Sequence, residues 1–260
     1  MKRLIYQVYV GKKSKLYDFC VASVTEYCKK HGIEHVVQKQ PILRIKPDIF
    51  ATNRSRESYE KYGGYLPIYE KENAFDYFDR YDQIAIVDAD IYIRENAPNI
   101  FEELEDNDFA AVCEREMPLT KQYKSKIENY SRMQYSTLKN VDWKWNNLGA
   151  EFFNMGLMVM NTSFSKYLKG QTSREFIERW EFKPFVDGLG PWKWSTDQTL
   201  LNWWIKKEKM KVKHLPWQYN ALYKGILDDK IPESYFVHFF LRDKLPERGE
   251  TIANIEGPWL

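Results

Sequence analysis

The sequence predicts an α/β protein with a doubly wound, mixed but mostly parallel sheet that is flanked by helices. Two observations predict this class. Strand-like and helix-like segments alternate through the first 113 residues, and the segment 84–93 opens with a run that is apolar on both faces. Strands separated by helical segments indicate parallel βαβ units. A strand buried on both faces is typical of the centre of such a sheet. At 260 residues, the chain fits one domain.

The expected elements follow the hydrophobic periodicity and the capping residues. In the first half, strands are expected at 4–10, 34–38, 84–93 and 109–113, and helices at 16–30, 68–78 and 99–104. The segment 114–150 is polar and aromatic with little periodicity, so an irregular lid or binding loop is expected there. Beyond it, strands are expected at 152–161, 212–215 and 235–240. Two helices are expected to begin at capping boxes, at residue 172 and at residue 195, and the second continues to about residue 207.

Composition excludes some classes of protein. The 39 basic residues nearly cancel the 37 acidic ones, which argues against nucleic-acid binding. Three cysteines form no disulfide framework and indicate a reducing compartment, so a cytoplasmic location is expected. No run reaches the ~18 apolar residues of a membrane-spanning helix. The basic segment 206–213 could still contact an anionic membrane surface.

The strongest candidate site is Asp88-Ala89-Asp90, at the end of the apolar run 84–87. In a continuous strand the two carboxylates project from the same face, roughly 7 Å apart. The carboxyl ends of strands are where open α/β sheets bind ligands. Two neighbouring carboxylates favour a cation, and Mg²⁺ or Mn²⁺ prefers such oxygen ligands. The alternative is that the strand has reached the surface, so that both carboxylates are simply solvated.

The segment 81–93 resembles the Asp-x-Asp strand of family 8 glycosyltransferases, the family that includes glycogenin and bacterial lipopolysaccharide galactosyltransferases. Further segments follow in the family's order, so the likeness covers about residues 60 to 246. The resemblance implies a GT-A fold in a single domain over 1–260, with a nucleotide-binding half at 1–113 and an acceptor-binding half at 114–260 that carries an insertion. It also implies transfer of a hexose from a nucleotide sugar, expected to be a UDP-sugar, to a glycan or other hydroxyl acceptor with retention of configuration.

The resemblance also implies roles for particular residues. His238 becomes the third metal ligand beside Asp88 and Asp90, and an imidazole ligand favours Mn²⁺ over Mg²⁺. Lys244, six residues after His238, is expected on the donor phosphates. Two departures are the Leu241 that stands where the family has glycine, and the absence of the tryptophan that follows the family's Lys-Pro.

The remaining members of the expected donor site contact the sugar or its reacting carbon. These residues are Lys71, Asn154, Gly156, Asp197 and Gln198. For Lys71 a solvated lysine is the alternative, for Asn154 a strand-edge bulge, and for the Asp197–Gln198 pair a capping role at the start of a helix. Gly156 is expected to allow a ligand or another backbone to approach closely.

The nucleobase is expected near Tyr9, Val10 and Gly11, because these residues follow the first strand at its carboxyl end. Two other functions are left open by the residues alone. A sugar-phosphate nucleotidyltransferase shares this kind of sheet, and a non-catalytic glycan-binding protein could use the nine tryptophans.

Overall fold

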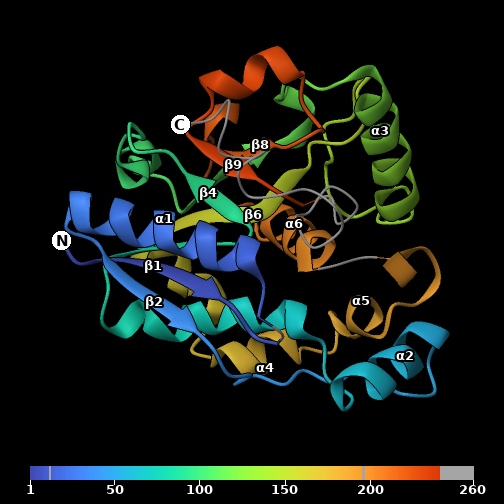
Figure 1. Cartoon of the computed structure of the whole chain (residues 1–260). Helices are drawn as coiled ribbons and strands as arrows, with labels where there is room; N and C mark the ends of the chain where they lie inside the picture. The colour runs from blue at the N-terminus through green and yellow to red at the C-terminus, as the bar shows by residue number, and fades with distance from the viewer. Residues whose placement is uncertain (12, 195–196, 241–260) are drawn as a thin grey trace.

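The computed structural model describes residues 1–11, 13–194 and 197–240 and is built around a six-stranded sheet (Figure 1). The strand order is β2-β1-β3-β6-β5-β7. The strands are β1 (Arg3–Val8), β2 (Glu34–Gln38), β3 (Gln83–Val87), β5 (Phe109–Cys113), β6 (Phe153–Asn161) and β7 (Val212–His214). Only β6 runs antiparallel to its neighbours within this sheet. The predicted fold class, a doubly wound and mostly parallel sheet, is therefore confirmed.

Helices cover both faces of the sheet, and alternate strand residues enter two separate cores. Tyr6 and Ile86 pack on one face with η1 (Pro67–Asp79), α4 (Ser173–Ile177) and α6 (Asp197–Lys207). Ile5 and Val87 pack on the other face with α1 (Lys15–His31), which lies along the sheet in Figure 1. The strand period of two explains this division, because successive side chains point to opposite faces.

A second, three-stranded sheet consists of β4 (Ile91–Ile93), β9 (Phe236–His238) and β8 (Ala221–Leu222), in that order. The expectation of one continuous strand over 84–93 is therefore wrong. The segment instead forms β3 and β4, which belong to different sheets. Residues 88–90 form a turn in which Ile91 N–H donates to the Asp88 carbonyl oxygen over 3.1 Å. This turn places two aspartates at the junction of the two sheets.

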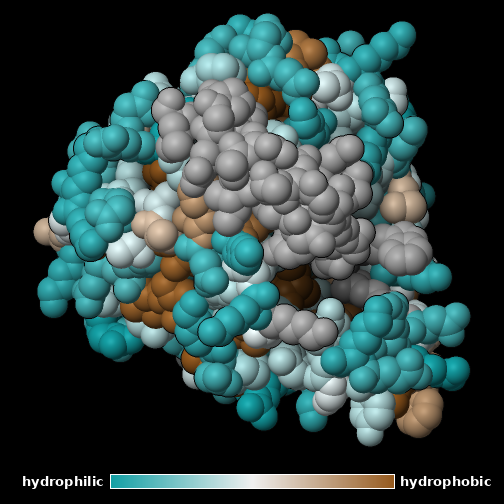
Figure 2. Space-filling model, in the orientation of Figure 1, coloured by the Kyte–Doolittle hydropathy of each residue, from teal (hydrophilic) through white to brown (hydrophobic). Residues whose placement is uncertain are grey.

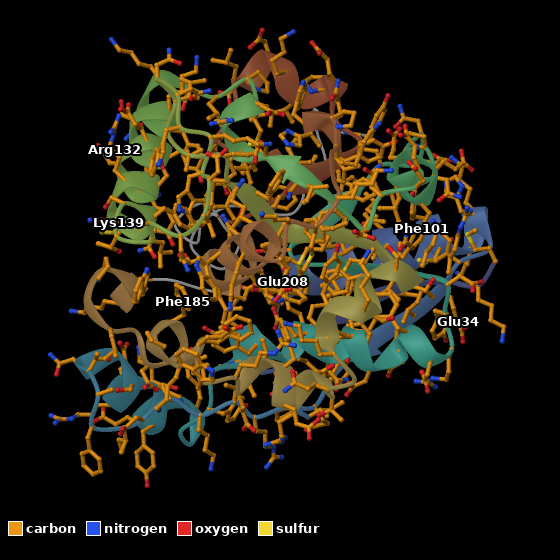
Figure 3. The ribbon with its side chains drawn as sticks, turned by 180° about the vertical axis from the view of Figure 1, so that it is seen from behind. Glu34, Phe101, Arg132, Lys139, Phe185 and Glu208 are labelled. Carbon is orange, nitrogen blue, oxygen red and sulfur yellow. The ribbon has the colours of Figure 1, made fainter. Side chains whose placement is uncertain are left out.

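Three α-helices were not predicted from the sequence, namely α2 (Asn53–Tyr62), α3 (Lys121–Tyr135) and the short α5 (Lys183–Asp187). The second lies within the segment expected to be irregular, so that expectation is wrong for these residues. The inward face of α3 includes Ser131 and Gln134 as well as Ile127, and a partly polar buried face gives little hydrophobic periodicity. Viewed from behind, Arg132 on α3 lies on the opposite side of the molecule from Glu34 on β2 (Figure 3).

Short helical segments make up most of the remaining regular structure. They are η2 (Ile100–Leu104), η3 (Glu114–Glu116), η4 (Thr162–Leu168), α5 (Lys183–Asp187), η5 (Gly190–Trp194), η6 (Trp217–Asn220) and η7 (Asp228–Glu233). Within the described ranges, no helix combines the length and the apolar character that crossing a membrane requires. The face shown in Figure 2 is mainly hydrophilic, with hydrophobic surface in separate patches.

Candidate functional site

Asp88, Asp90 and His238 converge at the junction of the two sheets. One ligand atom from each lies within 4.8 Å of the others. His238 Nε2 is 3.3 Å from Asp90 Oδ1 and 4.0 Å from Asp88 Oδ2. The backbone fixes this arrangement, since His238 pairs with Ile91 in the β4–β9 ladder and Phe239 N–H donates to the Asp90 carbonyl oxygen. Two carboxylates and one imidazole are a ligand set suited to a divalent cation.

A second residue orients the imidazole of His238. Its Nδ1 lies 2.9 Å from the side-chain oxygen of Asn220. Because that oxygen can only accept, Nδ1 carries the proton. When Nε2 carries no proton, the ring presents the lone pair of this atom towards the two aspartates, as a metal-binding histidine requires. Burial alone would lower the pKa of His238, but the carboxylates of Asp90 and Asp88 outweigh burial and raise it. A cation at this position must therefore compete with a proton.

Gly156 makes room for the same imidazole. A Cβ atom at this position would lie 2.4 Å from His238 Cε1 and 2.9 Å from the side-chain oxygen of Asn154. From the sequence, we expected a ligand or another backbone segment to approach Gly156. In the described structure the group that approaches it is the His238 ring. The Gly156 carbonyl oxygen also accepts the Asp88 N–H over 2.8 Å, which ties β6 to the aspartate turn.

Lys71 connects the aspartate turn with the start of α6. Its ammonium lies 3.1 Å from Asp88 Oδ1, 2.9 Å from Asp197 Oδ2 and 2.9 Å from the Met155 carbonyl oxygen. Burial alone would lower the pKa of Lys71, but the charges of Asp197 and Asp88 raise it. Lys71 is thus a buried, charged residue with three acceptors. The alternative of a solvated lysine is excluded by its 5% exposure.

The electrostatics of this cluster suit a divalent cation. Lys71 forms ion pairs with Asp88 and Asp197, and Asp90 lies beside His238, so these contacts bring together three carboxylates, one ammonium and one imidazole. The neighbouring Glu72 is fully buried, and neither of its carboxylate oxygens has a hydrogen-bond partner among the described residues. Burial first, and then the charge of Asp197, raise its pKa well above the usual range. Both effects favour the protonated form of Glu72, and burial likewise raises the pKa of Asp197.

A buried amide network lies directly behind the cluster. The Asn154 side-chain oxygen accepts from Asn220 Nδ2 over 2.9 Å and from Gly156 N–H over 2.9 Å. Asn154 Nδ2 donates to Glu114 Oε1 over 2.6 Å, and Gln198 Nε2 donates to the same oxygen over 3.1 Å. Asn154 therefore has partners for its amide, and it also lies beside a shift in the register of the β5–β6 ladder, where it pairs with Val112. The hydrogen-bonded amide and an irregular strand position thus occur together. Burial raises the pKa of Glu114 against the lowering effect of these two hydrogen bonds.

The end of β1 also approaches the aspartate turn. Gln7 Nε2 donates to the Asp88 carbonyl oxygen over 3.3 Å. Tyr9, Val10 and Gly11 follow β1 directly, and the Lys39 ammonium lies 3.9 Å from the centre of the Tyr9 ring. The base-binding role of these three residues stays a prediction.

Four further residues named in the sequence analysis remain to be placed. Ala89 is buried within the turn between the two aspartates. Leu241 and Lys244 lie outside the described residues, as does Ser195 of the expected capping box. The role of Lys244 on the donor phosphates therefore stays a prediction.

Sequence reasoning missed two residues of the site, Glu114 and Asn220. Glu114 directly follows the fully buried strand β5, so the rule that identified Asp88 at the carboxyl end of a strand could have identified it too. Asn220 lies at the end of η6. It contacts His238 across eighteen residues of sequence, and no local pattern indicates such a contact.

Comparisons with known proteins identify the family and the fold. The profile of glycosyl transferase family 8 matches residues 4–242. Among solved structures, the galactosyltransferase LgtC in complex with donor and acceptor sugar analogues is similar with a TM-score of 0.54 and 14% identity, covering 98% of this chain and 92% of that chain. The apo structure of the bifunctional glycosyltransferase WbbM is similar with a TM-score of 0.50 and 13% identity. That match covers 93% of this chain and 46% of that chain. Among curated proteins, none matches.

Proposed function

Since this chain belongs to glycosyl transferase family 8 and is therefore a glycosyltransferase, we propose that it moves a hexose from a uridine diphosphate sugar to a hydroxyl group of a glycan or similar acceptor. The convergence of Asp88, Asp90 and His238 is the observation that carries the proposal. Family membership favours glycosyl transfer over nucleotidyl transfer and over non-catalytic glycan binding. LgtC was solved with donor and acceptor sugar analogues, which supports a sugar donor and a glycan acceptor here.

We propose that Asp88, Asp90 and His238 hold a divalent cation, with Mn²⁺ preferred and Mg²⁺ as the alternative. The donor set fits this assignment, because it combines oxygen ligands with one imidazole whose Nδ1 is already bonded to Asn220. When bound, the cation would neutralise the charge that develops on a departing nucleoside diphosphate.

The chain's own residues would hold the donor around this position. Lys71 fixes the carboxylates of Asp88 and Asp197 relative to one another. Asp197, Asn154 and Gln198 are proposed to orient the sugar, and the proposed role of Lys244 is to contact the phosphates. A site whose polar groups are fixed before the substrate arrives stabilises developing charge with little reorganisation.

Retention of anomeric configuration is part of the proposal. Asp197 is the carboxylate proposed to lie nearest the sugar, and its Oδ2 is 2.9 Å from the Lys71 ammonium. A carboxylate engaged in a buried ion pair is a weak nucleophile, which supports a route without a covalent sugar–enzyme intermediate. Nuclear magnetic resonance of the product formed from an α-linked donor would report its configuration directly.

The variant Asp90→Asn tests the metal assignment. It removes one charged ligand and keeps the side-chain shape, so transfer and Mn²⁺ binding are expected to be lost while the melting temperature changes little. Asp79→Asn is the matched control, because Asp79 lies at the exposed end of η1 and is expected to leave both measurements unchanged. A panel of nucleoside diphosphate sugars, assayed with and without Mn²⁺, identifies the donor. Full transfer by Asp90→Asn, or by the wild type in excess chelator, would contradict the proposal.

A further inference from the structure

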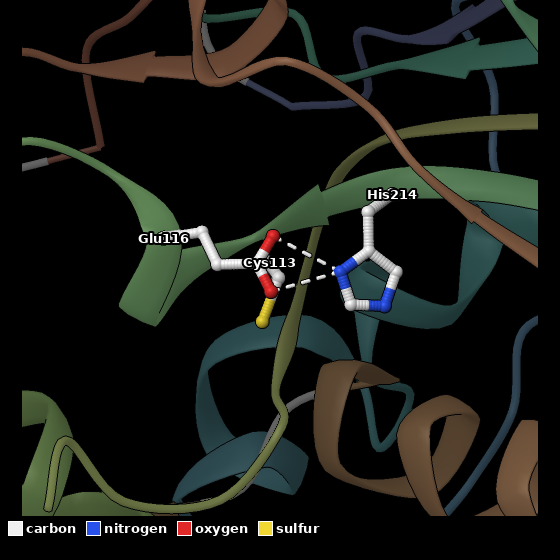
Figure 4. Close-up of side chains that lie close together, drawn as sticks. All are labelled: Cys113, Glu116 and His214. Atoms are coloured by element: carbon white, nitrogen blue, oxygen red, sulfur yellow. Dashed lines mark hydrogen bonds and ion pairs between the residues drawn. The ribbon is translucent and has the colours of Figure 1, made fainter.

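A second cluster of potential metal ligands lies at the same edge of the large sheet, two strands from the aspartate turn. Cys113 ends β5 and His214 ends β7. These strands are parallel, and Ala111 pairs with His214, so Cys113 and His214 project from the same face. Glu116 turns back towards them from η3. One ligand atom from each of the three residues lies within 4.8 Å of the others, and Figure 4 shows the Glu116 carboxylate beside the Cys113 sulfur and the His214 ring.

The His214 ring lies between two carboxylates, an arrangement that a second proton or a bound cation can satisfy. Its Nδ1 lies 2.9 and 3.0 Å from the two oxygens of Glu116, and its Nε2 lies 3.2 Å from Glu151 Oε1. In the imidazolium form both ring nitrogens donate, and the hydrogen bonds to Glu151 and Glu116 outweigh burial and raise the pKa of His214. A cation bound by Nδ1 and Glu116 would take the place of the proton on Nδ1, while Nε2–H would still donate to Glu151. This is the carboxylate–histidine–metal arrangement in which an outer carboxylate orients the ligand ring.

Glu151 is held firmly in that outer position. Its side chain is 6% exposed, Lys206 forms an ion pair with its second oxygen, and the Lys144 ammonium is 3.4 Å from its first. The His214 ring also packs edge-to-face on Phe153, with ring centroids 5.0 Å apart. The imidazole is thus fixed by one carboxylate and one aromatic ring, independently of Glu116.

We propose that Cys113, Glu116 and His214 form a zinc site that is separate from the proposed manganese site. A sulfur, a nitrogen and an oxygen ligand together suit zinc, whereas Mn²⁺ and Mg²⁺ prefer sites without sulfur. Zinc binding replaces the thiol proton of Cys113, which leaves to solvent, and forms the zinc–sulfur bond. Three protein ligands leave a fourth position for water.

The zinc site would also fix the segment that carries Glu114. This segment, residues 113–116, has zinc ligands at both ends, and Glu114 between them accepts hydrogen bonds from Asn154 and Gln198. Zinc would therefore hold Glu114 in the amide network behind the aspartate cluster. Because the ion binds only the folded chain in this arrangement, it should also raise the melting temperature.

Cobalt(II) substitution tests the proposal without measuring activity. The full chain, stripped of metal with a chelator, is titrated with Co²⁺, and the near-ultraviolet charge-transfer band of a cobalt–thiolate bond is recorded. One equivalent of Co²⁺ is expected to produce the band, and one equivalent of Zn²⁺ to abolish it. The band is expected to disappear in Cys113→Ser and to persist in Asp90→Asn. Cys28→Ser is the matched control, because Cys28 is also a buried free cysteine.

Two further variants keep the test valid if Cys113→Ser does not fold. Glu116 is 46% exposed, so Glu116→Gln should fold, and it is expected to weaken Co²⁺ binding at least tenfold. Glu151→Gln changes only the outer carboxylate and is expected to keep the band with about 10- to 100-fold lower affinity. A folded wild type without the band, a band that survives in Cys113→Ser, or unchanged affinity in Glu116→Gln would overturn the zinc assignment.

Discussion

Substitution of Gly156 by alanine tests whether His238 must occupy its observed position to bind metal. The added Cβ would lie 2.4 Å from His238 Cε1, 2.9 Å from His238 Nδ1 and 2.9 Å from the Asn154 side-chain oxygen. The imidazole is buried and bonded to Asn220, so it cannot rotate into solvent. The steric clash can therefore be relieved only if the His238 ring or β6 shifts. Either movement disturbs the proposed ligand set.

The short contact distances allow the expected losses of folding stability and of metal affinity to be given a magnitude. Adding one methyl group to a well-packed interior costs about 1–3 kcal/mol of folding stability. If the strain is relieved by moving the ring away from Asp90, the same energy weakens metal binding by about 5- to 150-fold. We therefore expect Gly156→Ala to unfold at lower denaturant concentration and to bind Mn²⁺ less tightly.

A double-mutant cycle with His238→Ala provides the control. Denaturant unfolding gives the stability of each variant, and Mn²⁺ titration followed by electron paramagnetic resonance gives its affinity. Removing the imidazole first should abolish most of the stability cost of Gly156→Ala, which leaves only the contact with Asn154. If Gly156→Ala binds Mn²⁺ as tightly as the wild type, or costs as much stability without the ring as with it, the steric reasoning is wrong.

Two further predictions concern a metal-orienting residue and a pH-dependent one. Asn220→Ala removes the acceptor of the His238 Nδ1–H, so Mn²⁺ affinity is expected to fall about 10- to 100-fold; unchanged affinity in the same titration would show that Asn220 does not orient the ring. Burial alone would raise the pKa of Asp108, but hydrogen bonds from Ser163, Tyr167 and Lys166 outweigh it and lower the pKa from 3.8 to about 2. Because the folded pKa is the lower one, this group stabilises the protein fully above pH 4, and the contribution is lost as the pH falls towards 2. Unfolding curves should show Asp108→Asn less stable by about 2 kcal/mol at pH 7, with the difference vanishing near pH 2; a constant difference across this range would contradict the assignment.

The sequence predicted the structure best where a buried strand leads directly into a candidate site residue. The apolar run at 84–87 predicted a central strand, and β3 is buried at every position. The position of Asp88 at the end of that strand predicted a ligand-binding place at the edge of the sheet. Of the predicted neighbours, Lys71 contacts Asp88 directly, and it also contacts Asp197. Their roles in catalysis remain predictions.

Other features could not be predicted, because they depend on contacts between distant segments or on polar packing. The buried face of α2 includes Ser55 and Ser58, and that of α3 includes Gln134, so neither helix shows a clear apolar stripe. The turn after Asp88 depends on β4 pairing with β9, almost 150 residues later in the chain.

The pairing of β4 with β9 has a consequence for insertions and deletions. His238 faces the aspartates because it is opposite Ile91 in this ladder. Side chains alternate along a strand, so a slip of one residue would turn His238 to the other face of the small sheet and bring Val237 or Phe239 into its place. A single-residue insertion or deletion within β4 or β9 should therefore remove the third ligand, even where both strands still pair. Changes of length in this protein are expected to be tolerated in surface segments and excluded from these two three-residue strands.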